Sequence, residues 1–175
     1  MESDLRYPIG KFQPVETLSD AGRGACIAQI ADVPARLSTA VAGLTPGQLD
    51  TPYRPGGWTI RQLVHHIADS HMNALTRFKL ALTENEPTIK TYEEGLWAEL
   101  ADTKTPPIEV SLALLDNLHK RWVILLRSLT AADWPRTFRH PEWGLATIDF
   151  LLAQYAWHGR HHVAHITSLR QRNGW

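Results

Sequence analysis

The sequence predicts an all-α fold, a four-helix bundle. Four stretches of the 175-residue chain place apolar residues at the three- and four-residue spacing of one helix face, and segments rich in proline and glycine separate these stretches. No segment shows a convincing strand pattern. Four long amphipathic helices imply a bundle, and the length fits a single domain over residues 1–175.

The first helix is expected over about residues 18–44. Pro34 lies inside it and removes one backbone donor, so we expect a kink or a break there. Residues 45–58 are dense in proline and glycine and are predicted to form a loop. The apolar face of this helix carries Ile27, Ile30, Val33, Leu37, Val41 and Leu44.

The second helix is expected to begin after Thr59. Thr59 and Gln62 have the spacing of a capping box, in which each side chain satisfies a free backbone donor near the helix start. Its apolar face extends to Leu82. Residues 83–107 are predicted to form a long crossover, with a short helix over 92–100 between its prolines.

The third helix is expected over about residues 108–129 and the last over 147–172, with a loop at 130–146 between them. Trp122 and Tyr155 fall on the apolar faces and are predicted to lie in the core. Leu-Thr pairs end the first and third helices, and Thr-Ile pairs start the second and fourth. This similarity between the two halves of the chain predicts two helix hairpins joined by the long crossover. The long crossover also indicates that the bundle is not a simple up-down-up-down one.

Charge and cysteine content limit the classes of binding partner and the cellular compartment that we expect for this protein. Lys plus Arg equals Asp plus Glu at 18 each, so no net field attracts nucleic acid or an anionic membrane. Cys26 is the single cysteine and can form no internal disulfide. The N-terminal residues are partly acidic and have no long apolar segment, and no apolar run reaches the ~18 residues of a membrane span. We therefore expect a cytoplasmic protein with no nucleic-acid or membrane partner.

Histidine is the most informative residue type in this sequence. There are nine histidines, and seven of them fall in two short segments. His158 and His162 lie one turn apart on or beside the apolar face of the last helix, an arrangement that brings two imidazoles together as zinc-binding pairs require. His161 and His165 point further out, which suits solvent, a supporting position behind a ligand, or a subunit contact.

A catalytic zinc usually takes three protein ligands and keeps a position open, so a third ligand should come from a facing helix. On the second helix His71 lies in the middle of the apolar face, whereas His65 and His66 lie on its flanks. Spacing alone leaves His66 and His71 as equal candidates. Asp69 lies nearly one turn after His66. Its carboxylate could orient a ligand imidazole by accepting the proton of that ring's free nitrogen in a hydrogen bond, although a solvated carboxylate fits equally well.

Any single one of these histidines is more readily explained as a core or capping residue than as a ligand. Two clusters on separate helices, one of them with inward histidines four residues apart, favour metal binding. No His-Glu-x-x-His, Gly-x-Ser-x-Gly or phosphate-loop motif is present, and no general base can be named from the sequence.

Several segments resemble the YfiT-like branch of the DinB superfamily, and together they span nearly all of the chain. They include Leu-Asp-Thr-Pro-Tyr-Arg at 49–54, Gly-Gly-Trp-Thr at 56–59, Val-His-His at 64–66, Ala-Asp-Ser-His-Met-Asn at 68–73, Trp-His at 157–158, His-His at 161–162 and Ala-His-Ile at 164–166.

This resemblance implies a four-helix bundle with one divalent metal ion, zinc or nickel, on His66, His158 and His162. It selects His66 over His71, which becomes a core or supporting residue. Members of the family are commonly labelled metal-dependent hydrolases, and relatives include transferases and isomerases that use low-molecular-weight thiols such as bacillithiol or mycothiol. The resemblance also implies a homodimer, with which exposed tryptophans such as Trp157 are compatible.

The leading hypothesis is therefore a metal-dependent enzyme, a hydrolase, that acts on a small molecule. Its metal lowers the pKa of a bound water or thiol and presents the resulting anion to an electrophile. The alternatives are an S-transferase that uses a low-molecular-weight thiol and a non-catalytic metal- or ligand-binding stress protein. Three neutral ligands with open positions argue against a purely structural zinc, and a helical interaction protein with incidental histidines would bind no stoichiometric metal.

Overall fold

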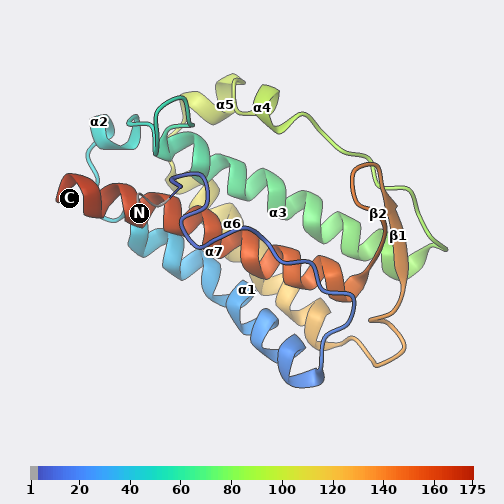
Figure 1. Cartoon of the computed structure of the whole chain (residues 1–175). Coiled ribbons are helices and arrows are strands. Elements are labelled where there is room, and N and C mark those ends of the chain that lie inside the picture. The colour runs from blue at the N-terminus through green and yellow to red at the C-terminus, as the bar shows by residue number, and fades with distance from the viewer. Residues whose placement is uncertain (1–3) are drawn as a thin grey trace.

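The computed structural model shows four long helices packed side by side, and it describes residues 4–175 (Figure 1). The four-helix bundle is thus confirmed. The partly acidic N-terminal residues noted in the sequence include Met1, Glu2 and Ser3, which lie outside the described residues. The long helices are α1 (Asp20–Val41), α3 (Ile60–Thr83), α6 (Glu109–Arg127) and α7 (Ile148–Asn173).

The helix starts that carry the site follow the predicted capping. The Thr59 hydroxyl accepts a hydrogen bond from the Gln62 backbone N–H at 3.1 Å, and the Gln62 side chain accepts one from the Thr59 N–H at 2.9 Å. The Thr147 hydroxyl accepts from the Phe150 N–H at 3.1 Å at the start of α7. These caps satisfy backbone donors that a helix start leaves free, and so fix where the histidine-bearing helices begin.

The order of the helices around the bundle corrects the predicted hairpins. α1 packs mainly against α6 and α7, and α3 packs against the same two helices, so α1 and α3 lie across the diagonal. In Figure 1, α1 and α7 run toward the end that holds the C-terminus, while α3 and α6 run away from it. The helices of each half are antiparallel, but neither α1 with α3 nor α6 with α7 forms a main packing contact. The segments at 42–59 and 128–147 are long enough to cross the end of the bundle, and sequence spacing could not show that they do.

The first helix is not broken at Pro34, which lies inside α1. Proline has no N–H, so the carbonyl of Ile30, four residues earlier, loses its usual helical partner. The His119 ring supplies a replacement, because its Nδ1 lies 2.7 Å from the Ile30 carbonyl oxygen. The bundle thus satisfies the acceptor that Pro34 leaves free.

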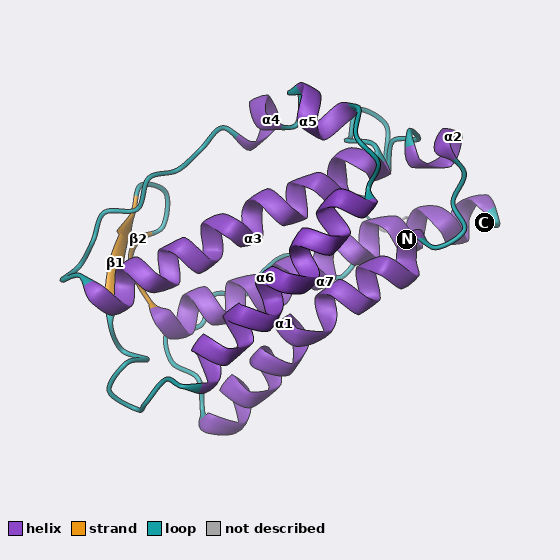
Figure 2. Cartoon of the chain, turned by 180° about the vertical axis from the view of Figure 1, so that it is seen from behind, coloured by secondary structure: helices purple, strands orange, loops and turns teal. Residues whose placement is uncertain are grey.

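Three predicted irregular segments contain regular structure. The loop at 45–58 includes the short helix α2 (Pro46–Leu49), and two single-turn helices, α4 (Glu94–Trp97) and α5 (Ala101–Lys104), replace the helix expected at 92–100 (Figure 2). The expectation of no strands is wrong, since an antiparallel pair, β1 (Thr137–His140) and β2 (Gly144–Thr147), lies in the predicted loop at 130–146. Strands of four residues are too short to produce a clear alternation.

The β-hairpin closes one end of the bundle and holds the crossover in place. The backbone N–H of Ile89 donates to the carbonyl of Arg139 at 2.8 Å, and the N–H of Arg139 donates to the carbonyl of Pro87 at 2.9 Å. β1 is therefore bonded to the start of the crossover as well as to β2. This attachment brings the residues that follow Ile89 beside those that follow Arg139.

Two apolar clusters fill the bundle, and a band of histidines lies between them. One cluster contains Trp122 and Tyr155, which confirms both as core residues, and the other contains Leu37 and Ile67. Along α3 the two clusters meet at His71. No helix within residues 4–175 combines the length and the apolar character needed to cross a membrane.

Candidate metal centre

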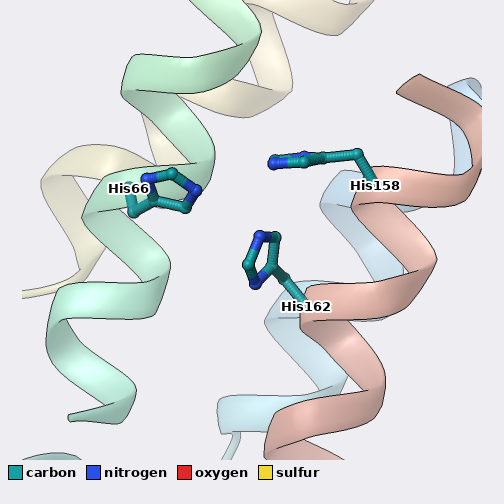
Figure 3. A group of neighbouring side chains, drawn as sticks. All are labelled: His66, His158 and His162. Atoms are coloured by element: carbon teal, nitrogen blue, oxygen red, sulfur yellow. The ribbon is translucent and has the colours of Figure 1, made fainter. Parts of the chain in front are cut away.

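The three histidines expected to hold a metal converge between α3 and α7. His66 projects from α3 toward His158 and His162, which lie one turn apart on α7 (Figure 3). One ring nitrogen from each lies within 4.8 Å of the others. Ring centroids are 4.5 Å apart for His158 and His162, and 4.9 Å for His66 and His162. The three lone-pair donors therefore face one small space.

Burial keeps these rings neutral, the form that binds a metal. Burial lowers the pKa of His66 to about 4. It also lowers the pKa of His158 and of His162 well below the usual value, and the neighbouring histidines add to both shifts. A neutral imidazole offers one nitrogen lone pair, whereas a protonated one offers none. The site is consequently ready to accept a cation at neutral pH.

A relay of hydrogen bonds runs behind His158 and crosses all four long helices. His158 Nδ1 lies 3.2 Å from His71 Nε2, and His71 Nδ1 lies 2.7 Å from His119 Nε2. His119 Nδ1 in turn lies 2.7 Å from the carbonyl oxygen of Ile30. The relay thus joins α7, α3, α6 and α1.

The carbonyl at the end of this relay decides which nitrogen of each ring carries the proton. A carbonyl oxygen only accepts, so His119 must be protonated on Nδ1 and must accept on Nε2. His71 then has to donate from Nδ1 and accept on Nε2, and His158 has to donate from Nδ1. The lone pair of His158 is thereby left on Nε2, which lies 3.4 Å from the Ser70 hydroxyl and would exchange this long contact for a metal.

A shorter relay supports His162. His165 Nε2 lies 3.1 Å from the carbonyl oxygen of Arg6, in the segment that precedes α1, and His165 Nδ1 lies 3.4 Å from His162 Nδ1. By the same reasoning His165 donates from Nε2 and accepts on Nδ1 from His162. The lone pair of His162 is then on Nε2. Both ligand candidates of α7 are therefore oriented through another histidine to a main-chain carbonyl.

A second histidine group, His161, His162 and His165, also meets the distance requirement for a metal. It shares His162 with the first group, so the two groups compete for that ring. Both ring nitrogens of His165 are already engaged, Nδ1 with His162 Nδ1 and Nε2 with the Arg6 carbonyl. This favours His66, His158 and His162 as the ligand set.

The remaining histidines of the two clusters lie in defined environments. His161 and His165 are 7% and 2% exposed, so of the three positions considered for them, solvent is wrong, and His165 takes the supporting position behind a ligand candidate. His161 stacks on Trp157, with ring centroids 4.2 Å apart, and the Trp157 indole N–H donates to the Gly10 carbonyl at 3.2 Å. Trp157 is therefore partly covered by the N-terminal segment and is not fully exposed. His65 is buried and its Nδ1 lies 2.7 Å from the Ser111 hydroxyl, away from the metal candidates.

Asp69 does not orient a ligand in the described structure. Its carboxylate makes no hydrogen bond to His66, and its pKa is raised to about 6 by burial, with a contribution from Asp102. The orienting groups are instead His71 and His165. Sequence reasoning missed His119, and the one signal for it is Pro34, which frees the carbonyl that His119 contacts.

An open cavity of about 370 Å³ gives access to the histidines. It borders a second cavity of about 290 Å³, and both are lined by His158 and Glu94. A larger surface groove of about 740 Å³ lies between α1 and α7, but it is lined by none of the histidines of the described chain. Volume alone therefore does not identify the reactive site. The walls of the first cavity include Tyr53, Arg54, Trp58, His66, Trp157, His161, His162 and His165.

Comparison with known proteins identifies the family. The sequence model of the DinB superfamily matches residues 29–166. The chain belongs to the DinB superfamily. It is 57% identical over 172 residues to a protein of Bacillus mycoides, covering 98% of this chain and 99% of that one, and 56% identical over 173 residues to one of Bacillus cereus strain B4264, covering 99% of each. Both relatives bear the name "Putative metal-dependent hydrolase".

Two solved structures of helical bundles resemble this one. YfiT from Bacillus subtilis superimposes with a TM-score of 0.95 at 51% identity and 98% coverage of both chains. It is described as a probable metal-dependent hydrolase with an unusual four-helix bundle topology. TT2238, described as a four-helix bundle protein, superimposes with a TM-score of 0.52 at 23% identity, over 81% of this chain and 94% of its own. The second likeness concerns the fold alone.

Proposed function

We propose that this protein is a metal-dependent hydrolase in which His66, His158 and His162 hold one divalent ion, zinc or nickel, at the wall of an open cavity. The observation that carries the proposal is the convergence of three neutral imidazoles from two helices, with ring nitrogens within 4.8 Å of one another. The names of close relatives and of the superimposable YfiT support the same class of reaction.

The residues present fit such an ion. Three nitrogen ligands with further positions open are the donor set of catalytic zinc sites, and structural sites normally close with four. The hydrogen bonds behind His158 and His162 leave each lone pair on Nε2, and the long contact of His158 Nε2 with the Ser70 hydroxyl, 3.4 Å, is one that a metal would replace. When bound, a divalent cation supplies Lewis-acid chemistry and lowers the pKa of a water or thiol ligand.

The chain's own groups would orient the reactants and move protons. The two relays hold His158 and His162 in fixed ring orientations, so little reorganisation is needed when a substrate enters. Glu94 lines both cavities, and its carboxylate is our candidate for the proton acceptor. Glu94→Gln is expected to lower kcat while metal content stays at the wild-type level.

The ligand set is tested by elemental analysis of untagged protein. We expect about one metal ion per chain in the wild type, from the one ligand set proposed, and loss of that ion in His66→Ala, His158→Ala and His162→Ala. His161→Ala is the matched control, because His161 lies on the same helix and belongs only to the second group. Loss of metal in His161→Ala with retention in His66→Ala would place the ion in the second group and refute the proposed set.

The reaction class is tested on the metal-loaded protein. One assay follows hydrolysis of activated esters and amides, and a second follows addition of a low-molecular-weight thiol to an electrophile such as a haloaromatic compound. Hydrolysis that is lost in His66→Ala supports the proposal. Turnover only when a thiol is added would favour the S-transferase, and metal binding with no turnover in either assay would favour a binding protein.

A further inference from the structure

The second cavity contains a buried cation without a counter-ion. Arg77 lies on α3 and is 7% exposed. In the described chain its guanidinium makes one hydrogen bond, from Nη1 to the Tyr155 hydroxyl at 3.1 Å, and no carboxylate lies within ion-pair distance of it. Its Nε is buried and has no partner. Arginine cannot escape this cost by losing its proton, and an unpaired buried charge is strongly unfavourable.

Other hydrogen-bond donors line the same cavity. His140, on β1, accepts a hydrogen bond at Nδ1 from the Glu142 backbone N–H at 3.2 Å, so its proton lies on Nε2. Tyr155 accepts from Arg77, and its own O–H is left free to donate; burial raises the pKa of this hydroxyl and keeps it protonated. The Ser70 hydroxyl also lines the cavity and lies 3.4 Å from His158 Nε2. The buried side of the wall therefore presents one permanent positive charge with donors beside it, whereas the exposed side carries the carboxylates of Glu93, Glu94 and Glu142, none of them within ion-pair distance of Arg77.

The position of this cavity connects it to the metal centre. His158, one of the proposed ligands, lines both cavities, and the charge of Arg77 contributes to the lowered pKa of His158. A molecule that reaches the histidines can therefore extend along His158 into the cavity of Arg77. Guanidinium groups pair with carboxylates through parallel hydrogen bonds, and the unpartnered Nε is one of the donors such a pair uses.

We infer that the cavity lined by Arg77, Tyr155 and His140 is a subsite for a carboxylate group of the substrate, next to the metal centre. The inference rests on the proposed function, because it takes the metal centre as the place of reaction. It narrows the substrate class to small carboxylic acids or their conjugates, held by the acid group while another part of the molecule lies at the histidines. It also gives the β-hairpin a role, since β1 carries His140 to this wall.

Arg54 is the competing cation and provides the control. It lines the first cavity, but its Nε donates to the Tyr53 hydroxyl at 3.1 Å and its Nη1 donates to the Pro55 carbonyl at 3.0 Å. Fewer of its donors are free than those of Arg77. Arg54→Gln therefore removes a positive charge near the same histidines without touching the proposed subsite.

The test uses propionate as the probe and the neutral propionamide as its matched partner, with metal-free and zinc-loaded full-length protein. Binding is followed by the ¹⁵N–¹H NMR signal of Arg77 Nε and by titration calorimetry. We expect propionate, and not propionamide, to shift the Arg77 signal in both forms. In Arg77→Gln the Kd for propionate should rise about tenfold or more, as for loss of a charged hydrogen bond, while Arg54→Gln should bind as the wild type does.

The results separate this inference from the proposed function. Failure of the metal analysis would refute the metal centre, yet the Arg77 signal in metal-free protein would still test the subsite. An Arg77 signal that does not respond to propionate would overturn the subsite even if metal binds normally. A loss of propionate binding in Arg54→Gln would move the anion to the first cavity and overturn it as well. The wild-type NMR measurement does not depend on the folding of any variant.

Discussion

Replacement of His71 by leucine tests whether the relay behind His158 controls the metal site. His71 is fully buried, accepts from His158 at 3.2 Å and donates to His119 at 2.7 Å. Leucine can do neither, so His158 Nδ1–H and His119 Nε2 are both left without a partner. Each unsatisfied buried group costs about 1–3 kcal/mol, so we expect the free energy of unfolding to fall by about 2–6 kcal/mol.

The effect on metal binding follows from the freedom that His158 gains. Without His71, the ring of His158 can rotate, and His158 can carry its proton on Nε2, the nitrogen that should face the metal. Loss of a hydrogen-bond partner behind a ligand typically lowers metal affinity about 10–100-fold. His119→Leu should have a smaller effect, because His71 remains in contact with His158 and loses only the partner that fixes its own proton.

The assay is competition for zinc with a chromophoric chelator, at a temperature where circular dichroism shows the variant to be folded. ¹⁵N NMR of the histidine rings in metal-free protein gives an independent measure, and we expect protons on Nδ1 of His158, His71 and His119 in the wild type. His65→Leu is the matched control, since it removes another buried histidine of α3 and its hydrogen bond to Ser111. Unchanged zinc affinity in folded His71→Leu, or an equal loss in His65→Leu, would refute the role of the relay.

Three further predictions concern stability. Metal-free protein should lose stability as the pH falls from about 6.5 toward 4, because the unfolded chain gains protons that the buried rings do not; chemical denaturation at several pH values should show a slope of about 1.4 kcal/mol per pH unit for each such histidine. Gly159→Ala should cost about 1–3 kcal/mol, because a Cβ there would lie 2.4 Å from Val33 Cγ2 at the contact of α7 with α1; its control, Gly24→Ala, meets open space and should be neutral or stabilising. Arg23→Met should cost about 3–5 kcal/mol, because it leaves the buried carboxylate of Asp149, 2.7 Å from Arg23 Nη2, without its cation. The first of these three predictions, on pH, rests on the buried histidines whose pKa is lowered to about 4, which are His66, His119, His161 and His165.

Each of these predictions has a result that would contradict it. A metal-free protein equally stable at pH 7 and pH 5 would show that the histidines are not buried neutral. Equal melting temperatures for Gly159→Ala and Gly24→Ala would mean that α1 and α7 can separate at no cost. An unchanged denaturation midpoint in Arg23→Met would mean that the Asp149 carboxylate is hydrated.

The sequence by itself determined the local structure and the chemistry available. Helical periodicity found the four long helices, and the threonine caps fixed the starts of α3 and α7, because both depend on interactions between residues a few positions apart. The four-residue spacing of His158 and His162 placed them on one helix face for the same reason. Cytoplasmic location and a homodimer remain predictions.

Only the tertiary structure decided how these parts meet. The diagonal position of α1 and α3 depends on paths of the connecting segments that local spacing does not encode. The approach of His66 to His158 and His162, the relay through His119 to the carbonyl freed by Pro34, and the meeting of Arg77 with His140 join residues that are distant in the chain. Such contacts arise from packing between helices. A pattern along one helix shows which face a histidine occupies, but the facing helix determines whether that histidine meets a metal, another histidine or the core.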